Sequence, residues 1–465
     1  MGAESTSGAR AGAVPSTRGT STSNFGVGRR ESHDSSGFYG RFEQPVLSDD
    51  DTVVSPTPVT EPFVCGDARD MSMLADGSVA LVVTSPPYFA GKQYEEELER
   101  DGVPSSYIEY LEMLHDVFTE CVRVLEPGGR IAVNVANLGR KPYRSLTADV
   151  IHLLQDRLGL LLRGEIVWQK GAGASGSCAW GSFRSPTNPV LRDLTERVVV
   201  ASKGRFQRAL TVEQRRRRGL PHEATIGTDD FMSLTLDVWS VPTESARRVG
   251  HPAPFPVELP EKLIDLYTFT DDLVLDPFMG SGSTLVAASR LGRRFIGYDL
   301  DPTYVDLARR RVGEEGAPID VDPGHRTGSK DLVAEVLADA GFTVDGSAGV
   351  RVRGAGLTVH QVAIDATGGR WVIELGGPFV RHRGGLTSAD AVWRTLGRLH
   401  ALRGVGERVL VLTSDLPARH SELDQAVRAA GREAVHDVID VFDPAALERL
   451  RRYAAGETDQ LTGFW

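Results

Sequence analysis

The feature that most restricts the fold of this chain is an alternation of short apolar runs with segments of helical periodicity, which begins near Glu61. The continuous run Val79–Thr84 (VALVVT) is typical of a strand buried on both faces of a parallel sheet. Apolar residues then recur at spacings of three and four over 107–125, which marks one face of a helix, and Pro127-Gly128-Gly129 is expected to end it. Strands that alternate with helices predict an α/β fold with a doubly wound, mostly parallel sheet.

The same pattern continues along the chain. We expect further strands at 63–65, 130–135, 165–168, 197–201, 273–275 and 294–298, and further helices at 146–154, 258–269 and 283–291. In sheets of this kind the ligand lies beyond the carboxyl ends of the strands. The segments that follow strands are therefore the ones to inspect for chemistry.

Composition divides the chain into four parts. Residues 1–58 are rich in Ser, Thr, Gly, Arg and Pro and have few apolar side chains, which predicts a disordered tail. We expect a first domain at 59–312, a linker at 313–330 and a second, smaller α/β domain at 331–465. In that second domain we expect a helix, three strands, a helix, a strand, a helix and a strand, at 332–340, 350–352, 359–364, 370–375, 389–402, 408–412, 422–430 and 435–441.

Cysteine content and hydropathy restrict the compartment. No apolar run approaches the ~20 residues of a membrane-spanning helix, and the start of the chain lacks the apolar core of a signal peptide. The 3 cysteines, Cys65, Cys121 and Cys178, lie far apart with no C-x-x-C spacing. This argues against a disulfide framework or a cysteine zinc site and predicts a reducing, cytoplasmic location.

A glycine-bearing turn follows the expected strand at 273–275. The segment 276–284 (DPFMGSGST) would let the backbone turn sharply at Gly280 and Gly282 and approach a ligand, with a helix N-terminus facing an anionic group such as a carboxylate. No Lys follows, so this is not a phosphate-binding loop of the G-x-x-x-x-G-K-[ST] type. Asp299 ends the next strand, where an acid can accept hydrogen bonds from ribose hydroxyls. Taken alone, the glycines are equally compatible with a structural strand–helix turn.

A second turn, TSPPY at 84–88, follows the buried strand directly. Two consecutive prolines fix φ and remove two N–H donors, which gives a rigid turn. Ser85 Oγ and the Pro86 carbonyl can accept hydrogen bonds from one exocyclic amine, and Tyr88 offers an aromatic face to a planar base. Such a site suits an extruded, stacked nucleobase. The structural alternative is a proline-rich turn with a core tyrosine.

Together the two turns resemble the motifs of the DNA amino-methyltransferases, which transfer a methyl group from S-adenosylmethionine to cytosine N4 or adenine N6. TSPPY resembles their catalytic motif, and DPFMGSGST resembles their cofactor loop, with Ser283 where Thr is commoner. GHPAPFP (250–256), IVWQKG (166–171) and VVVASKG (198–204) also fit. The catalytic motif comes first, as in the beta-type permutation. The resemblance covers about 61–312 and implies a Rossmann-like methyltransferase fold and S-adenosyl-L-methionine as cofactor.

The resemblance also implies roles for individual residues. The target-base site would consist of Ser85, Pro86, Pro87 and Tyr88. The cofactor would be lined by Asp276, Pro277, Phe278, Gly280, Ser281, Gly282, Ser283 and Thr284, with Asp299 at the ribose, Asp67 at the adenine ring, and His251 and Pro252 over the methionine end. No metal site is implied.

The resemblance favours one base over the other. A Ser before Pro-Pro-Tyr is commoner in the cytosine-N4 enzymes of the family, so we expect cytosine N4, with adenine N6 as the alternative. Because no Cys follows the proline pair, methylation of cytosine C5 is not expected.

Charge is segregated along the chain, although the net charge is −11. Residues 157–218 carry 13 Lys/Arg and 4 Asp/Glu, a net of +9, whereas 92–126 carry 3 and 10, a net of −7. The basic block overlaps the position, about 171–250, where the beta-type arrangement has its target-recognition region. The candidate contacts to double-stranded DNA are Arg184, Arg192, Lys203, Arg205, Arg208, Arg215, Arg216, Arg217 and Arg218. A solvated basic loop is the alternative.

The order of elements in the second domain resembles the fold of restriction-type nucleases, whose metal site uses an Asp and a D/E-x-K motif. Asp365 and Glu374 occupy plausible positions for carboxylates that bind Mg²⁺, but Gly376 stands where the Lys would be. We therefore expect an accessory domain without cleavage activity that binds DNA or a partner. An unrelated α/β accessory domain is the alternative.

The leading hypothesis is a sequence-specific DNA methyltransferase of restriction–modification, phage defence or epigenetic marking. It would act in the cytoplasm as a monomer or homodimer, with a cognate restriction endonuclease as a candidate partner. The alternatives are an enzyme that both methylates and cuts DNA, a non-catalytic DNA-binding relic, and a methyltransferase acting on RNA or protein.

Overall fold

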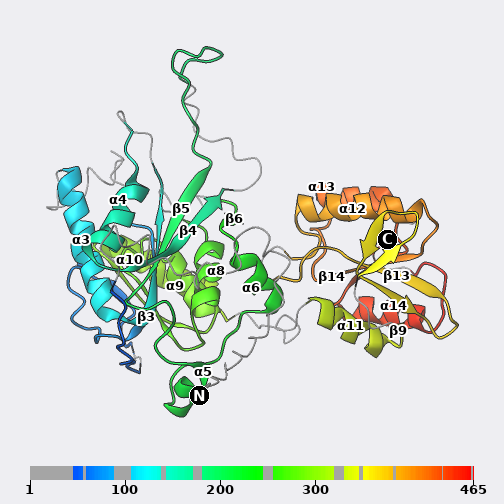
Figure 1. The fold of residues 1–465 in the computed structure, drawn as a ribbon, viewed down its shortest axis with the longest axis horizontal. Helices are drawn as coiled ribbons and strands as arrows, with labels where there is room; N and C mark the ends of the chain where they lie inside the picture. The colour runs from blue at the N-terminus through cyan, green and yellow to red at the C-terminus, as the bar shows by residue number, and fades with distance from the viewer. Residues whose placement is uncertain are drawn as a thin grey trace, which may run out of the picture. The chain divides into compact units, whose positions relative to one another are not determined.

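The computed structural model describes most of the chain. The described residues are 46–55, 59–87, 106–137, 143–170, 181–244, 255–318, 329–344, 349–380, 384–431, 433–461 and 464. Two folded regions, up to residue 318 and from residue 329, are treated separately below (Figure 1). No helix in the described part of the chain is both long enough and apolar enough to cross a membrane.

Within the described residues, the first region contains an eight-stranded sheet. In spatial order its strands are β1 (Phe63–Cys65), β8 (Arg294–Asp299), β7 (Leu273–Asp276), β2 (Val79–Thr84), β3 (Leu125–Val135), β5 (Thr195–Ser202), β4 (Leu161–Gln169) and β6 (Val238–Ser240). β5 runs antiparallel to both of its neighbours, and the other pairs are parallel. The predicted α/β class with a mostly parallel sheet is confirmed.

The crossover connections of this sheet lead to opposite sides from the pair of neighbouring strands β7 and β2. From β7 it passes through α9 (Ser283–Arg290) to β8 on one side, and from β2 it passes through α3 (Tyr107–Val124) to β3 on the other. The adjacent carboxyl ends of β7 and β2 therefore lie at a topological switch point, where open α/β sheets bind their ligands.

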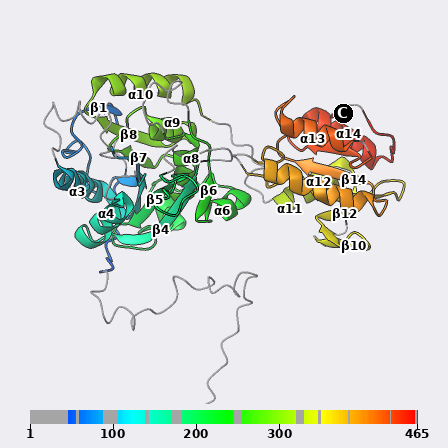
Figure 2. The ribbon, with the colours of Figure 1, turned by 90° about the horizontal axis from the view of Figure 1, so that it is seen from above.

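Helices cover both faces of the sheet (Figure 2). α3 and α4 (Leu146–His152) pack with Val82 on one face, whereas α8 (Glu258–Tyr267) and α9 pack with Leu81 and Val83 on the other. α10 (Pro302–Glu315) packs against α9, β1 and β8. The apolar run of β2 is thus divided between two cores, as expected for a strand buried on both sides.

Local sequence explains where α3 begins and ends, with one correction. The Ser106 side chain caps the helix by accepting from the Glu109 N–H, and a buried stripe that includes Tyr110 and Phe118 faces the sheet. The helix ends at Val124, but the predicted Pro-Gly-Gly breaker lies inside β3. Gly128 takes φ +77°, and a Cβ there would lie 2.0 Å from the Gln207 carbonyl oxygen. The glycine therefore lets a neighbouring segment pass close to the strand.

The structure adds elements that the sequence analysis did not predict. In the first region these are a π-helical turn (Leu153–Arg157) after α4, α5 (Val212–Arg217), α6 (Thr228–Leu234), β6 and α10. α10 continues to Glu315, beyond the predicted domain end at 312. Its start could have been recognised, because Asp301 caps it and Pro302 occupies its first turn.

The predicted disordered tail is too long at its C-terminal side. Residues 46–55 are described, and the Ser48 N–H donates to the Gly204 carbonyl at 2.7 Å. Arg205 Nη1 donates to the Asp50 carbonyl at 2.7 Å. This part of the predicted tail is therefore held against the first region.

The second region contains a mixed sheet. Among its described residues, the strands in spatial order are β15 (Asp437–Asp440), β14 (Val409–Thr413), β13 (Arg370–Leu375), β12 (Gln361–Ile364) and β9 (Thr343–Val344), with a separate hairpin of β10 (Val350–Val352) and β11 (Leu357–Val359). β9, β12 and β13 form an antiparallel meander, and β13, β14 and β15 are parallel.

Helices also cover both faces of this second sheet. α11 (Ser329–Ala340) and α14 (Pro444–Ala454) pack on one core, and α12 (Ala389–Arg403) and α13 (Glu422–Ala430) pack on the other. The predicted order of elements is present, but the strand expected at 359–364 is divided into β11 and β12, and α14 follows the last strand.

Candidate functional site

Two loops meet at the switch point of the first sheet. β2 and β7 are paired in register, with Val82 opposite Leu275, and their last residues are joined by a hydrogen bond. Thr84 Oγ1 donates to Asp276 Oδ1 at 2.7 Å, and Thr284 Oγ1 donates to the Val83 carbonyl at 3.3 Å. The structure therefore holds residues 84–87 of the TSPPY turn directly beside the DPFMGSGST loop.

Asp276 is a fully buried acid at the centre of this junction. Its Oδ1 accepts from Thr84 and from the Phe278 N–H at 3.1 Å, whereas its Oδ2 has no hydrogen-bond partner among the described residues. Burial raises the pKa of Asp276 to about 6, although these hydrogen bonds favour its ionised form. The site thus contains a buried carboxyl group with one acceptor atom still available.

The glycines of the cofactor loop are required by the backbone. Gly280 and Gly282 have φ of 47° and 78°, and Gly282 caps α9. A Cβ on Gly282 would lie 2.7 Å from the Cβ of Ala308 on α10, so the turn also depends on close packing. The Gly280 N–H donates to Asp299 Oδ2 at 3.0 Å, and burial raises the pKa of Asp299.

A buried arginine that the sequence analysis missed supports this loop from behind. Arg311 Nη1 donates to the carbonyl of Ser281 at 2.9 Å, to its hydroxyl at 3.1 Å, and to Ser283 Oγ at 3.3 Å. Its side chain is only 4% exposed. Nothing local marks Arg311 among the neighbouring arginines of α10; its role depends on how α10 packs against the loop.

The turn predicted to bind the target base is anchored on both sides at its described residues, 84–87. Tyr110 of α3 donates its hydroxyl to the Pro87 carbonyl at 2.5 Å. Ser85 Oγ donates to the Asn134 carbonyl at 3.3 Å and lies 3.4 Å from Asn134 Nδ2, and Pro86 is buried. Three other predicted site residues, Tyr88, His251 and Pro252, lie outside the described residues.

The third predicted cofactor acid lies at the same edge of the sheet. Cys65, the last residue of β1, is in register with Asp299, and Asp67 follows shortly after it. Asp67 Oδ2 pairs with Arg69 Nη2 at 2.5 Å, and this hydrogen bond lowers the pKa of Asp67. Acids from the ends of three neighbouring strands, β1, β8 and β7, are therefore brought together at one edge.

The antiparallel strand β5 separates the predicted DNA-binding residues into two groups. Arg184 and Arg192 lie between β4 and β5, and the pairing of Gln169 with Thr195 places their segment at the carboxyl edge, with Ser85. The residues after β5 leave toward the opposite edge, because Arg197 pairs with Val135 at the end of β3 and Ser202, the last residue of β5, pairs with Arg130 further back. Lys203, Arg205, Arg208 and Arg215–Arg218 belong to this second group.

Two members of the second group, Arg208 and Arg215, are paired with acids of the fold, so their prediction as DNA contacts was wrong. Arg208 and Arg215 form a buried network with Glu126 and Asp272, in which Arg215 Nη2 lies 3.0 Å from Asp272 Oδ1. Lys203 Nζ donates to the Leu125 carbonyl at 2.7 Å, just after the end of α3. Arg208 and Arg215 thus neutralise acids of the fold, whereas the contact of Lys203 with DNA stays a prediction.

Arg216, Arg217 and Arg218 of the second group are exposed and form ion pairs at the surface. Arg216 and Arg217 are 64% and 75% exposed and pair with Glu213 on α5. The Arg218 guanidinium is 50% exposed and lies 4.0 Å from Asp51. None of the three shares an edge of the sheet with the candidate site, so the sequence grouping of these basic residues did not predict a common face.

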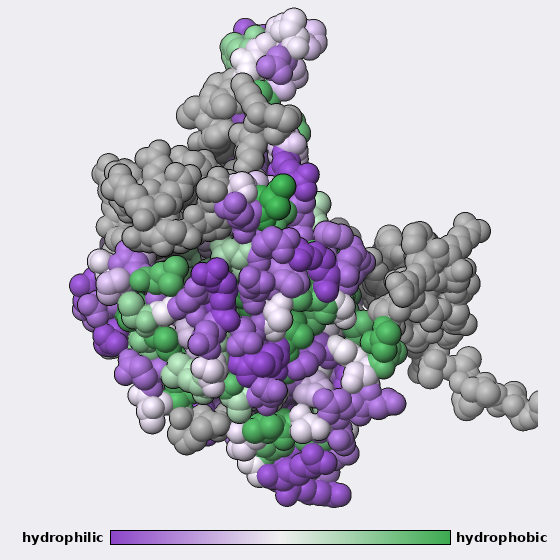
Figure 3. Space-filling view, turned by 90° about the vertical axis from the view of Figure 1, so that its left-hand side faces the viewer, coloured by the Kyte–Doolittle hydropathy of each residue, from purple (hydrophilic) through white to green (hydrophobic). Residues whose placement is uncertain are grey.

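The described part of the β4–β5 connection, residues 181–194, forms an arm at the carboxyl edge. The Ser182 N–H donates to the Asn188 carbonyl at 2.8 Å, and the Asn188 N–H donates to Ser182 Oγ at 2.7 Å, which closes its described end into a loop. Phe183 is 66% exposed and Leu191 is 93% exposed. Figure 3 shows hydrophilic and hydrophobic residues side by side on a part that projects above the body of the molecule.

In the second region, the expected pair of carboxylates is not assembled. Ile364 pairs with Arg370 at one end of the β12–β13 hairpin, and Gln361 pairs with Ile373 at the other. Asp365 and Glu374 therefore lie at opposite ends, separated along the hairpin by about 16 Å at ~3.3 Å per residue. The prediction that they could share Mg²⁺ was wrong. No group of three or more potential metal ligands occurs among the described residues.

Each of these two carboxylates has a structural role. Asp365 accepts from Trp371 Nε1 at 2.8 Å and from the Gly369 N–H at 2.7 Å, which holds the turn of the hairpin. Glu374 forms an ion pair with Arg398 of α12. The nuclease resemblance therefore has no metal-binding pair to support cleavage.

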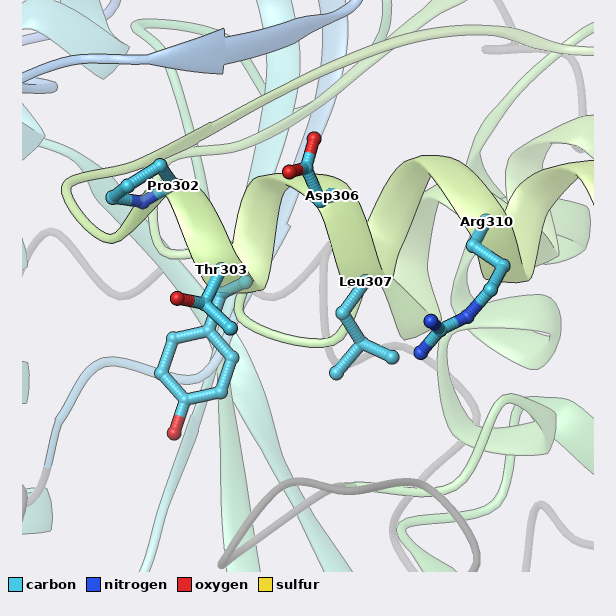
Figure 4. A pocket seen from close by; sticks show the side chains of 6 residues that line it. Pro302, Thr303, Asp306, Leu307 and Arg310 are labelled. Carbon is cyan, nitrogen blue, oxygen red and sulfur yellow. The ribbon is translucent and has the colours of Figure 1, made fainter.

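A separate hollow of about 450 Å³ lies along α10. It is lined by Pro302, Thr303, Tyr304, Asp306, Leu307 and Arg310, most of which are labelled in Figure 4. Among the described residues, none from the two loops at the switch point lines this hollow. We therefore place the chemistry at the strand ends and not in this hollow.

Known proteins are similar to the first region of this chain. Residues 79–310, from the first residue of β2 into α10, match the family model described as DNA methylase (N6_N4_Mtase). The chain is 32% identical over 272 residues to the type II methyltransferase M.MthZI of Methanothermobacter thermautotrophicus, which covers 53% of this chain and 75% of the relative. It is 26% identical to the DNA adenine methyltransferase YhdJ of Escherichia coli K12, over 54% of this chain and 82% of that protein.

A solved structure is also similar. TTHA0409 of Thermus thermophilus, described as a DNA modification methylase and crystallised with S-adenosyl-L-methionine, is 32% identical, with a TM-score of 0.40 over 54% of this chain and 92% of that one. The chain belongs to the N6/N4 DNA methylase family, and the resemblance stated from its motifs is confirmed.

Proposed function

We propose that this protein is a sequence-specific DNA methyltransferase that transfers a methyl group from S-adenosylmethionine to the exocyclic amine of an extruded base, with cytosine N4 as the acceptor. One observation carries the proposal. The hydrogen bond from Thr84 to Asp276 joins the base-binding turn to the cofactor loop at the switch point. Two motifs that are 192 residues apart in sequence thereby form one site.

The residues at the strand ends suit this cofactor. The open acceptor Asp276 Oδ2 is buried and suits a cationic group, such as the ammonium of the methionine part. The Asp299 and Asp67 carboxyls suit ribose hydroxyls and the adenine ring. The turn at Gly280 and Gly282, supported by Arg311, presents the start of α9 to the cofactor carboxylate.

The base-binding turn supplies positioning and acceptors. S-Adenosylmethionine, when bound, provides a methyl group on a positively charged sulfur. Ser85 Oγ, whose proton is directed to the Asn134 carbonyl, would accept a hydrogen bond from the amine, and the Pro86 carbonyl would be the second acceptor. Both stabilise the positive charge that develops on the amine nitrogen as the N–C bond forms and the C–S bond breaks. The amine then loses one proton to water.

DNA recognition is assigned to the carboxyl edge. The arm carries Arg184 and Arg192 for phosphates, and the exposed Phe183 beside them for contact with bases. The choice of cytosine N4 rests on Ser85 before the two prolines. Because the relatives include a type II methyltransferase, we extend the proposal to restriction–modification, with a cognate endonuclease as partner.

The test is single-molecule sequencing of DNA from cells that express the protein. We expect N4-methylcytosine in one fixed sequence context, and no mark from Ser85→Ala or Tyr88→Ala variants that still bind S-adenosylmethionine by calorimetry. Ser72→Ala, at an exposed position outside the site, is the matched control. N6-methyladenine would overturn the choice of base. Absence of any modified base from a wild-type protein that binds the cofactor would overturn the function.

A further inference from the structure

A line of polar side chains crosses the sheet just below its carboxyl edge and ends at Ser85. Asn134 of β3 donates from Nδ2 to Glu196 Oε2 of β5 at 2.6 Å, and the same nitrogen lies 3.4 Å from Ser85 Oγ. The other Glu196 oxygen, Oε1, pairs with Lys170 Nζ at 2.8 Å, directly after β4. Four adjacent strands of the sheet thus contribute to one connected set of groups.

Asn134 and Glu196 are buried in the sheet, where most side chains are apolar. Asn134 is 3% exposed and Glu196 is 8% exposed. The Lys170 side chain is 24% exposed, and its ammonium lies 5.8 Å from the centre of the Trp168 ring. A buried carboxylate is costly to maintain, and removing its partner would leave the charge uncompensated. Because Glu196 is linked through Asn134 to Ser85, the buried carboxylate can act on the proposed base-binding turn as well as on packing.

The geometry points to a role for the ion pair in orienting Ser85. Lys170 forms an ion pair with the Glu196 carboxylate, and a carboxylate can only accept hydrogen bonds. Glu196 therefore requires the NH₂ side of the Asn134 amide, through a short, charge-assisted hydrogen bond. With the amide fixed, its nitrogen also faces Ser85 Oγ, while the Asn134 backbone carbonyl takes the Ser85 proton.

We infer that Glu196 and Lys170 are positioning residues that act through Asn134 to hold the Ser85 hydroxyl as an acceptor toward the target amine. This inference rests on the proposed function of Ser85. It also gives a role to the end of the IVWQKG segment, which the family resemblance left without one. The strand register supports it, because Trp168 pairs with Glu196 and Asn134 pairs with Val198.

The experiment compares kcat, KM for DNA and the Kd for S-adenosylmethionine in four variants of the full chain. Glu196→Gln and Lys170→Met remove the charge on either side of the pair, and Lys170→Arg preserves it. We expect Glu196→Gln and Lys170→Met to lower kcat by about ten- to 100-fold, the scale of a small misplacement of a reacting group. The Kd for the cofactor should change less than about twofold, because the cofactor loop is on other strands. Lys170→Arg should retain most of the wild-type kcat.

The fourth variant, Glu196→Gln/Lys170→Met, tests whether the two residues act as one unit. Its kcat should equal that of either single variant, because each single change already releases the Asn134 amide. A structural role alone would lower the unfolding temperature and weaken cofactor binding in step with kcat. Lys170, at the partly exposed end, keeps the test informative if Glu196→Gln does not fold.

The outcomes separate the inference from the function on which it rests. A wild-type protein that marks DNA, together with charge-removing variants of unchanged kcat, would overturn the inference and leave the proposed function intact. A wild-type protein that binds cofactor without marking DNA would overturn both. Equal losses in Lys170→Arg and Lys170→Met would also contradict the inference, because the charge is then not what matters.

Discussion

At the scale of single residues, Asp276 shows how burial can prepare a site for a cation. Burial raises the pKa of this acid from 3.8 to about 6, so the folded protein keeps a proton on it between about pH 4 and 6 that the unfolded chain has lost. The stability that this proton contributes is fully present below the unfolded pKa and is lost as the pH rises through 6. A cation placed beside Oδ2 would reverse the preference and favour the ionised form.

This predicts that cofactor binding depends on pH through Asp276. The affinity for S-adenosylmethionine should rise by up to about tenfold per pH unit between pH 5 and 6 and level off above 7, with release of one proton. Isothermal titration calorimetry in buffers of different ionisation enthalpy measures both quantities. Asp276→Asn should bind more weakly and lose the slope. Asp67→Asn should keep it, because the hydrogen bond from Arg69 lowers the pKa of Asp67, away from this range. A flat wild-type profile would contradict the placement of a cation at Asp276.

The role of a residue was predictable where the local sequence alone restricts the backbone. Gly280 and Gly282 lie in a short loop whose positive φ angles require glycine, and Ser85 is fixed by the two prolines that follow it. Arg311 and Asn134 were not predictable, because their roles arise from α10 and β3 being packed against loops far away in sequence. The sequence around Arg311 or Asn134 does not indicate which distant loop each residue contacts.

At the scale of elements, the direction of β5 decided which basic residues were misassigned. An apolar run such as VVVA reads the same in a parallel and an antiparallel strand, since side chains alternate in both. Reversal of β5 places the segment that directly follows it, including α5, at the edge opposite Ser85. The arginines there are consequently joined to acids of the fold, and two of them are buried.

The buried network predicts different stability effects within one helix. Arg215→Ala should destabilise the protein by about 3–5 kcal/mol, because Glu126 and Asp272 would lose a buried partner. Arg216→Ala, at the next position but 64% exposed, should change stability by less than about 0.5 kcal/mol. Urea unfolding followed by circular dichroism compares the two. Similar losses for both variants would show that the network does not support the fold as inferred.

At the scale of the whole molecule, the alternation of strands and helices was enough to predict two α/β regions and the doubly wound sheet of the first. The meeting of the two loops was also predictable, because parallel strands place their carboxyl ends at one edge. The metal pair in the second region was not. Asp365 and Glu374 are near in sequence, but an antiparallel hairpin with Ile364 opposite Arg370 places them at its two ends.

The location of basic residues at opposite edges of the first sheet predicts different effects on DNA binding. An Arg184→Ala/Arg192→Ala variant should weaken binding of a cognate duplex and reduce the slope of log K against log salt by about 2, one for each phosphate that is no longer neutralised. Arg216→Ala/Arg217→Ala removes the same charge from the opposite edge and should leave both quantities nearly unchanged. Fluorescence anisotropy at salt concentrations between about 50 and 200 mM, the range over which phosphate contacts change affinity most visibly, measures both variants. If the second variant bound DNA as weakly as the first, net charge and not the carboxyl edge would govern binding, and the arm would have no special place in recognition.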